Sequence, residues 1–245
     1  MTFEGLGAAQ LAARLSLPQC LVHERVASTM DAAHAAAADG AAAGTLVLAN
    51  AQDAGRGRGG KRWTSPPGGG LWMTLIERPA SPQGLEVLSL RIGLRVAAAL
   101  DALAEHPISL KWPNDLQVQG AKLGGILVEA RWRDLRIEWV AIGIGVNVRS
   151  PLGVEAATGL RAGTSRLEAM GCIVPALRAA AHLEGPLTAA ELAQFASRDA
   201  ATGRRIQQPA VGVVRGIGAT GELMVETEAG IMACRSGSLV FAENR

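Results

Sequence analysis

The residues best suited to chemistry form one loop, Gly55-Arg56-Gly57-Arg58-Gly59-Gly60-Lys61-Arg62-Trp63, which we call the glycine–arginine loop. Its four cationic side chains lie on a backbone with little bulk, so amides and charges can approach an anion closely. Strand-like sequences precede it at residues 45–49 and follow it at residues 69–76. A phosphate-bearing ligand suits such a loop, although a solvated basic loop would show the same composition.

Known phosphate-binding patterns match this loop only in part. Its glycine spacing satisfies the dinucleotide fingerprint, but residues 63–70, which should open a helix, contain two prolines and three glycines. The spacing also satisfies most of a P-loop, whose last position must be a hydroxyl residue and is Arg62 here. An RNA-binding Arg-Gly segment would be repetitive, and this sequence occurs once.

Four further polar pieces lie at the ends of predicted strands and could act with the loop. They are Gln52, Lys111-Trp112-Pro113-Asn114-Asp115, Lys122-Leu123-Gly124-Gly125-Ile126-Leu127-Val128-Glu129 and Gly143-Ile144-Gly145-Val146-Asn147. Together with the loop they supply several cations, a carboxylate that could bind magnesium, and glycines that permit close ligand approach. This set suits attack on a nucleotide phosphate, where negative charge must be neutralised. The order of a Ser-His-Asp hydrolase and the surroundings of a reactive cysteine are both missing from the sequence.

Length, composition and charge limit the class of protein and the partners that the chain can have. The 245 residues, 49% of them hydrophobic, are enough for one large domain and a small one. A net charge of +2 does not indicate nucleic acid or a membrane surface as a partner. The three cysteines are far apart, form no metal-ligand spacing, and suit a reducing compartment. No signal peptide or membrane span is visible in the sequence, so we expect a cytoplasmic protein.

The elements that must position these residues follow from hydrophobic periodicity and turn signals. Helices are expected at residues 8–15, 28–39 and 85–105, with two more within 159–202. Strands are expected at residues 45–49, 69–76, 108–112, 123–132 and 137–146, with a turn at 114–116. From about Gly203 the sequence changes to short strand-like segments separated by glycine turns. This pattern predicts a small β-barrel. We therefore expect a catalytic domain at residues 1–202 and a small C-terminal domain at 203–245.

The chain resembles the biotin–protein ligase family in motifs that occur in order from about Val22 to the end: Ser-Thr, Gln-x-x-Gly-Arg-Gly-Arg-Gly-Gly-Lys-x-Trp, Lys-Trp-Pro-Asn-Asp, Lys-Leu-Gly-Gly-Ile-Leu-Val-Glu and Gly-Ile-Gly-Val-Asn-Val. The resemblance implies an α+β fold of the class II synthetase-like, biotin–lipoate ligase type. This fold has a mixed β-sheet with helices packed mainly on one face and a small C-terminal SH3-like β-barrel.

The resemblance also implies a two-step reaction. Biotin and ATP, with Mg²⁺, form biotinyl-5′-AMP and pyrophosphate. The biotin then passes to one lysine of a biotin carboxyl carrier domain, in acetyl-CoA carboxylase or a related carboxylase. The physics is consistent with this, because a carboxylate that approaches a polyanion needs cations nearby.

Particular residues acquire roles through the resemblance. Biotin would be held by residues of the first two motifs: Ser28, Thr29, Gln52, Arg56, Gly57 and Arg58. The catalytic cations would be Lys122, which bridges the biotin carboxylate and the α-phosphate, together with Arg58 and Lys111. The nucleotide and metal would be held by Trp63 under the adenine, Asn114 near the phosphates and Asp115 at Mg²⁺. Three residues would line the pocket: Gly125, Gly143 and Asn147.

Two departures and several alternatives accompany this interpretation. Met30 stands where the family often has asparagine. The sequence before Val22 is too short for the winged-helix DNA-binding domain of some members, so we expect a monofunctional ligase that binds no specific DNA. Ser28 and Thr29 could serve only as a helix cap. A lipoate–protein ligase and a non-catalytic biotin-sensing regulator are the alternative functions. We expect a monomer or weak homodimer. We also expect the ligand-free glycine–arginine loop to be mobile, because ordering its glycines costs backbone entropy and brings four like charges together.

Overall fold

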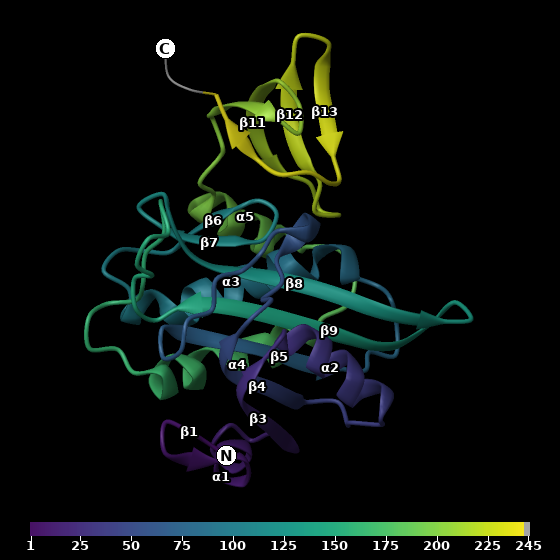
Figure 1. The fold of residues 1–245 in the computed structure, drawn as a ribbon. Coiled ribbons are helices and arrows are strands. Elements are labelled where there is room, and N and C mark those ends of the chain that lie inside the picture. The colour runs from purple at the N-terminus through teal and green to yellow at the C-terminus, as the bar shows by residue number, and fades with distance from the viewer. Residues whose placement is uncertain (243–245) are drawn as a thin grey trace.

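The central element of the computed structural model, which describes residues 1–242, is a seven-stranded mixed sheet (Figure 1). Its strand order is β3-β4-β5-β9-β8-β7-β6. The pair β3 and β4 is parallel, and all other neighbours are antiparallel. The strands are β3 (Gln19–Val26), β4 (Thr45–Gln52), β5 (Gly70–Glu77), β6 (Ser109–Lys111), β7 (Asp115–Val118), β8 (Ala121–Arg133) and β9 (Arg136–Asn147). A short N-terminal hairpin consists of β1 (Thr2–Phe3) and β2 (Leu6–Gly7).

Five α-helices accompany the sheets in the described chain: α1 (Ala8–Arg14), α2 (Thr29–Ala38), α3 (Leu88–Leu100), α4 (Arg166–Ala181) and α5 (Ala189–Arg198). Three single turns of 3₁₀-helix occur at η1 (Arg58–Gly60), η2 (Leu85–Val87) and η3 (Asp101–Leu103). The N-cap of α2 is Ser28, whose Oγ accepts a hydrogen bond from the Met30 N–H at 3.2 Å. The sequence therefore predicted this cap correctly.

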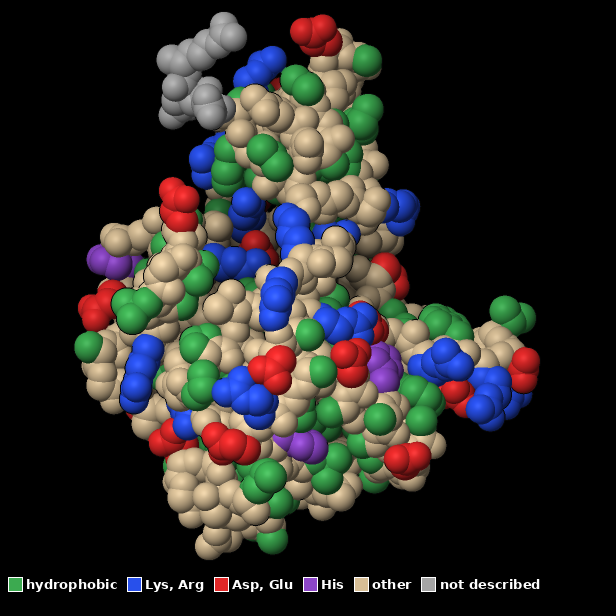
Figure 2. Space-filling view, in the orientation of Figure 1, with side chains coloured by type: hydrophobic (Ala, Val, Ile, Leu, Met, Phe, Trp, Pro, Cys, Tyr) green, Lys and Arg blue, Asp and Glu red, His purple; other side chains and the backbone are tan. Residues whose placement is uncertain are grey.

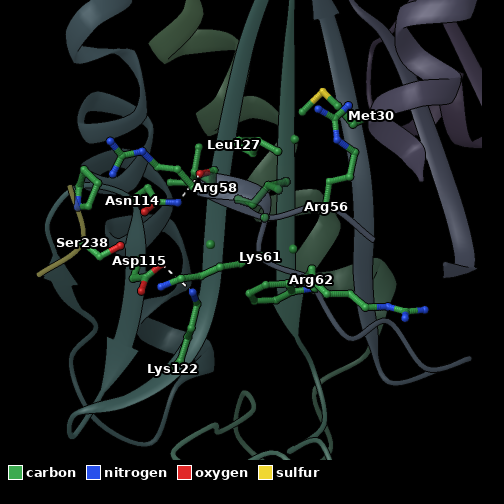
Figure 3. A pocket seen from close by; sticks show the side chains of 18 of the residues that line it. Met30, Arg56, Arg58, Lys61, Arg62, Asn114, Asp115, Lys122, Leu127 and Ser238 are labelled. Atoms are coloured by element: carbon green, nitrogen blue, oxygen red, sulfur yellow. Dashed lines mark hydrogen bonds and ion pairs between the residues drawn. The ribbon is translucent and has the colours of Figure 1, made fainter. Parts of the chain in front are cut away.

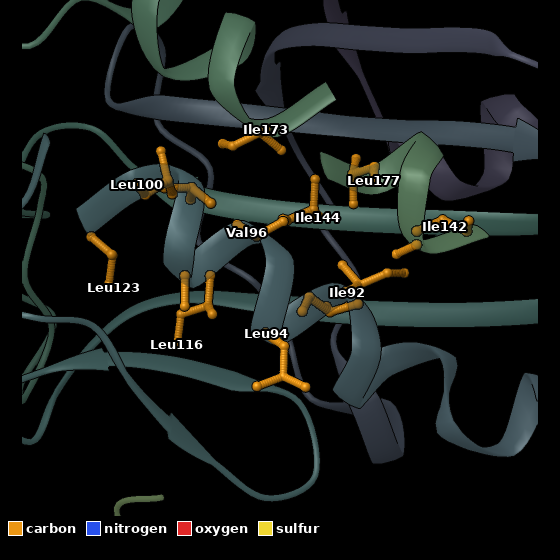
Figure 4. Close-up of a cluster of buried hydrophobic side chains, with 14 of the residues drawn as sticks. Ile92, Leu94, Val96, Leu100, Leu116, Leu123, Ile142, Ile144, Ile173 and Leu177 are labelled. Atoms are coloured by element: carbon orange, nitrogen blue, oxygen red, sulfur yellow. The ribbon is translucent and has the colours of Figure 1, made fainter. Parts of the chain in front are cut away.

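Successive side chains along each strand point to opposite faces of the sheet, so the sheet separates two hydrophobic layers. On β4, Leu46 and Leu48 belong to the larger core, whereas Val47 packs with Ala33 and Ala37 of α2. Helices α3 and α4 supply the larger core, where their aliphatic side chains meet Ile142 and Ile144 of β9 (Figure 4). The predicted fold class, a mixed sheet with helices packed mainly on one face, is confirmed.

A second sheet follows the helices and is antiparallel, with the order β13-β12-β11-β10-β14. Its strands are β10 (Arg205–Gln208), β11 (Gly212–Ile217), β12 (Leu223–Thr227), β13 (Gly230–Cys234) and β14 (Val240–Phe241). The sheet meets the rest of the molecule where Trp112 Nε1 donates a hydrogen bond to the Gly221 carbonyl at 2.9 Å. This arrangement agrees with a small SH3-like unit. The boundary between residues 202 and 203 stays a prediction, and residues 243–245 of the predicted domain lie outside the described chain.

Several local predictions differ from the structure. The expected helix over residues 85–105 is interrupted at both ends, because η2 and η3 tighten its first and last turns and Ala104 is extended. The turn expected at residues 114–116 lies earlier, at residues 112–114, so the prediction is right for Asn114 and wrong for Asp115 and Leu116. Strand β7 begins at Asp115, where Lys111 and Gly125 pair with it on its two sides. The sequence analysis also did not anticipate β3 or β10.

No helix in residues 1–242 is long and apolar enough to cross a membrane.

Candidate functional site

One cavity of about 350 Å³ brings the sequence motifs together on the α2 side of the sheet (Figure 3). Its walls are the N-terminus of α2, the glycine–arginine loop, and the facing parts of β8 and β9. The residues predicted for the site that line this cavity are Ser28, Thr29, Gln52, Arg56, Gly57, Arg58, Trp63, Lys111, Asn114, Asp115, Lys122, Gly125 and Gly143. The volume is in the range expected for a small-molecule site.

Glycines on β8 and β9 make the floor of the cavity. Gly125 and Gly145 are paired across the two strands. A Cβ on Gly145 would lie 2.6 Å from the Trp63 ring, and a Cβ on Gly143 would lie 2.7 Å from Met30 Cε. The missing side chains therefore let Trp63 and Met30 lie against the sheet, where any larger residue would displace them.

A chain of hydrogen bonds crosses the end of the cavity next to α2. The Thr74 hydroxyl donates to Thr29 Oγ1 at 3.0 Å, and the Thr29 hydroxyl donates to Gln52 Oε1 at 3.1 Å. Gln52 Nε2 donates in turn to Ser65 Oγ at 2.7 Å. These contacts fix the orientation of the Gln52 amide, so this end presents ordered donors and acceptors to a polar ring. The sequence analysis missed Thr74, although a hydroxyl in the otherwise apolar Leu71–Ile76 run was an available signal.

The opposite end of the cavity is strongly cationic. Six cationic side chains line the cavity: Arg56, Arg58, Lys61, Arg62, Lys111 and Lys122. Of the lining residues in the described chain, only Asp115 is acidic. Lys and Arg side chains also gather where the C-terminal sheet meets the main body (Figure 2). Such an excess of positive charge in a concave site favours an anion that carries several charges.

Lys122 and Lys111 flank the single carboxylate. Lys122 Nζ lies 2.7 Å from Asp115 Oδ1 and 5.2 Å from the centre of the Trp63 ring. Burial lowers the pKa of Lys111, and the positive charge of Lys122 lowers it further, against the opposing effect of Asp115. An arriving anion would relieve this repulsion. Asn114 shapes the wall, since its Nδ2 donates to the Ile126 carbonyl at 2.7 Å.

Arg58 is the loop residue that reaches the C-terminal sheet. Its Nη1 donates to the Gly237 carbonyl at 2.7 Å, and its guanidinium carbon lies 5.9 Å from the centre of the Trp112 ring. Burial lowers the pKa of Arg58, and the nearby Asp115 carboxylate acts in the opposite direction. Burial does not change the charge state, because an arginine remains protonated in proteins.

Asn147 is not among the residues that line the cavity, so the cavity gives no support to its predicted place in the pocket wall. Its Nδ2 donates to the carbonyls of Thr158 at 3.1 Å and Lys122 at 3.4 Å. The backbone of Lys122 is held from the same side, because its N–H donates to the Ala156 carbonyl at 2.7 Å. Asn147 therefore supports the start of β8 and acts on the site through Lys122.

The C-terminal sheet also closes part of the cavity, which the sequence did not predict. Ser238, Leu239 and Val240 line it, although they lie far from the motifs in the sequence. Figure 3 shows Ser238 beside Asn114 and Asp115. No motif signals this contact, since only the docking of the second sheet creates it.

Comparison with known proteins matches the chain to a family model. The model of the Biotin/lipoate A/B protein ligase family matches residues 22–147. The bifunctional ligase/repressor BirA of Bacillus spizizenii is 42% identical over 132 residues, which is 53% of this chain and 41% of that protein. The biotin–[acetyl-CoA-carboxylase] ligase of Paracoccus denitrificans is 38% identical over 117 residues, 45% of this chain and 47% of that protein. The matched segments thus span less than half of these relatives.

Similarity to solved structures extends over nearly the whole chain. The structure of biotin protein ligase from Aquifex aeolicus in complex with biotin and ATP superposes with a TM-score of 0.76 at 25% identity. The superposition covers 92% of this chain and 99% of that one. It therefore extends well beyond the segment that the family model matches and reaches into the C-terminal sheet.

Proposed function

The chain belongs to the biotin/lipoate A/B protein ligase family, and from this premise we propose that it is an ATP-dependent biotin–protein ligase. It activates biotin as biotinyl-5′-AMP and then transfers biotin to a lysine of a biotin carboxyl carrier domain. The names of the relatives from Paracoccus and Aquifex support the choice of biotin, ATP and a carboxylase as the reactants. A cytoplasmic location and a monomer or weak homodimer remain predictions.

One observation carries the proposal: a single cavity joins an ordered polar end to a cationic end. Thr74, Thr29 and Gln52 offer hydrogen bonds to a ring with polar groups. Lys122, Arg58 and Lys111 line the same cavity and suit a carboxylate beside a phosphate chain. A ligand with a polar ring and a carboxylate tail, joined to a nucleotide, matches both ends at once.

In the first step a carboxylate oxygen of biotin attacks the α-phosphorus of ATP. The bond from that phosphorus to the oxygen that bridges to the β-phosphate breaks, and pyrophosphate leaves with the electron pair. Lys122, which lines the cavity, would contact both anions, and its positive charge would offset the repulsion between them. Arg58 and Lys111 stabilise charge on the phosphates, and Trp63 supports the adenine.

In the second step the amine of a carrier lysine attacks the acyl carbon of the adenylate. AMP leaves, the nitrogen loses a proton, and an amide bond remains. The mixed anhydride is labile in water, so the glycine–arginine loop and Ser238–Val240 have to exclude solvent until the carrier arrives.

Magnesium enters this proposal with the nucleotide. No group of three or more His, Cys, Asp or Glu side chains able to hold a metal occurs within residues 1–242. Mg²⁺ is commonly held by one or two carboxylates together with substrate phosphates. Asp115 therefore fits as a single protein ligand, although Lys122 occupies one of its oxygens at 2.7 Å in this structure. When bound, Mg²⁺ would neutralise part of the phosphate charge.

The buried hydrogen-bond chain favours biotin over lipoate. The ring of lipoate carries no hydrogen-bonding groups, so it would make no hydrogen bonds to the ordered hydroxyl and amide groups at this end, which already bond to one another. Sites built for hydrogen bonds discriminate against analogues that lack them, because such an analogue forgoes the hydrogen bonds that biotin would make here.

Mass spectrometry of a purified biotin carboxyl carrier domain tests the proposal. With biotin and MgATP, one biotin should be attached to one carrier lysine, whereas lipoate in place of biotin should give no product. Transfer of lipoate without transfer of biotin would favour the lipoate ligase. Binding of biotin without any adenylate or transfer would favour a biotin-sensing regulator, and a ligand-dependent gel shift with one operator sequence would support that reading.

A further inference from the structure

Arg56 takes part in an ion-pair network that reaches beyond the cavity. Its Nη1 lies 2.7 Å from Asp31 Oδ1 on α2, and its Nη2 lies 2.6 Å from Glu129 Oε1 on β8. The second Glu129 oxygen lies 3.0 Å from His34 Nε2. The ring of His34 accepts a hydrogen bond at Nδ1 from Trp139 Nε1 at 2.9 Å.

The network fixes the state of His34. An indole N–H can only donate, so Nδ1 of His34 is an acceptor and carries no proton. The ring proton is therefore on Nε2, where it is donated to Glu129. Trp139 is buried and packs with Ala33 and Val47, so the network is anchored in the hydrophobic layer beneath α2.

Charge distinguishes Arg56 from Arg58, two of the three arginines of the loop. Arg56 faces two carboxylates, so the three groups together carry a net negative charge and attract no further anion. Arg58 donates to the Gly237 carbonyl, a neutral group, and keeps its full positive charge beside the cationic end of the cavity. An arginine bonded to a neutral carbonyl exchanges that contact for a phosphate at lower cost than one held by two carboxylates.

These contacts also bear on the expectation that the ligand-free loop is mobile. That expectation rested on the backbone entropy of the loop's glycines and on repulsion among its four like charges. In the structure Arg56, Arg58 and Arg62 each have an oxygen partner, that of Arg62 being the Asp53 carbonyl. These contacts offset part of the charge repulsion and leave the entropic reason in place, so mobility of the ligand-free loop stays a prediction.

We propose that Arg56 is a tether of the glycine–arginine loop, with Glu129 and His34 as its positioning residues, and that Arg58 is the loop arginine available to an anionic ligand. The tether joins the loop to α2 and β8, two elements that line the cavity. Its role is to hold the loop over the ligand and slow the escape of the adenylate. The part of this inference that concerns the adenylate rests on the proposed function.

Hydrogen exchange in the ligand-free protein tests the tether without any assumption about the reaction. Glu129→Gln should speed amide exchange across residues 55–63 by roughly fivefold, the scale of a half-exposed ion pair. Glu226→Gln, which removes the carboxylate from a half-exposed pair with Arg215 in the C-terminal sheet, is the matched control and should leave that segment as it was. If amide exchange across residues 55–63 is unchanged in Glu129→Gln, the proposal that Arg56 tethers the loop is refuted.

Single-turnover kinetics then distinguish the role of Arg56 from the role of Arg58. Arg56→Gln should speed dissociation of biotinyl-AMP by roughly tenfold and slow its formation by less, whereas Arg58→Gln should slow formation by about 100-fold. Equal slowing of formation in both variants would refute the division of roles. If Arg56→Gln fails to fold, Arg56→Lys, which keeps one ion pair at a time, should still speed dissociation over the unaltered protein. Unchanged dissociation in that variant would contradict the proposal. A wild-type protein that forms no adenylate would refute the proposed function and leave the exchange result standing.

Discussion

Replacement of Lys122 by alanine separates a catalytic role from a structural one. In the folded protein Lys122 makes one ion pair with Asp115, and 37% of its side chain is exposed. Such a pair contributes at most about 1 kcal/mol to the free energy of unfolding. For a chain of this size, a loss of ~1 kcal/mol lowers the melting temperature by about 2–4 °C. Structural damage from Lys122→Ala should therefore be small.

The expected effect on activation is far larger. If Lys122 interacts more strongly as charge develops at the α-phosphate, its loss should slow adenylate formation by about 100- to 1,000-fold, or ~2.7–4 kcal/mol in the activation free energy. Rapid-quench measurement of biotinyl-AMP at saturating biotin and ATP gives this rate, and calorimetry gives the melting temperature. Near-normal single-turnover rates, or a melting temperature that falls far enough to explain the loss, would refute the assignment of Lys122.

Three further changes probe the rest of the cavity. Gly145→Ala places a Cβ 2.6 Å from the Trp63 ring, so the KM for ATP should rise roughly tenfold as base stacking is lost. The control Gly171→Ala, in helix α4 with open space around its Cβ, should instead add up to about 1 kcal/mol of stability in chemical denaturation. Thr74→Val removes the first donor of the buried hydroxyl–amide chain, so calorimetric titration should show biotin affinity falling roughly tenfold, since an unpaired buried group costs ~1–3 kcal/mol. Burial chiefly lowers the pKa of Lys111 below its ordinary 10.5. Its charge is present below that lowered pKa and lost above it, so the KM for ATP should begin to rise below pH 10.5, and Lys111→Arg should move that rise to higher pH.

The sequence predicted the parts of this molecule that local pattern determines. Continuous apolar runs marked β4, β5 and β9, because a strand buried on both faces needs no polar alternation. A shorter apolar run at its start marked β8, which is only partly buried. The site motifs lie at the ends of those strands. The pairing of Gly125 with Gly145 then brings two motifs together across β8 and β9.

Features that depend on tertiary docking were not predictable. Gly237 and Arg58 are separated by 179 residues, and no local pattern indicates which surface the C-terminal sheet will meet. Asn147 ends its strand, and the loop that contains Ala156 and Thr158 determines where its amide points. The pairing of Arg56 with Glu129 likewise depends on how the loop lies over β8.

The most direct test of the central claim, that this cavity activates biotin with ATP, is exchange of label between pyrophosphate and ATP. The assay needs no carrier domain, because exchange reports reversible adenylate formation alone. Biotin should start exchange, lipoate should not, and Lys122→Ala should reduce the rate by about 100-fold or more. Exchange that needs lipoate, or none with biotin while the protein is folded and MgATP is present, would contradict the account.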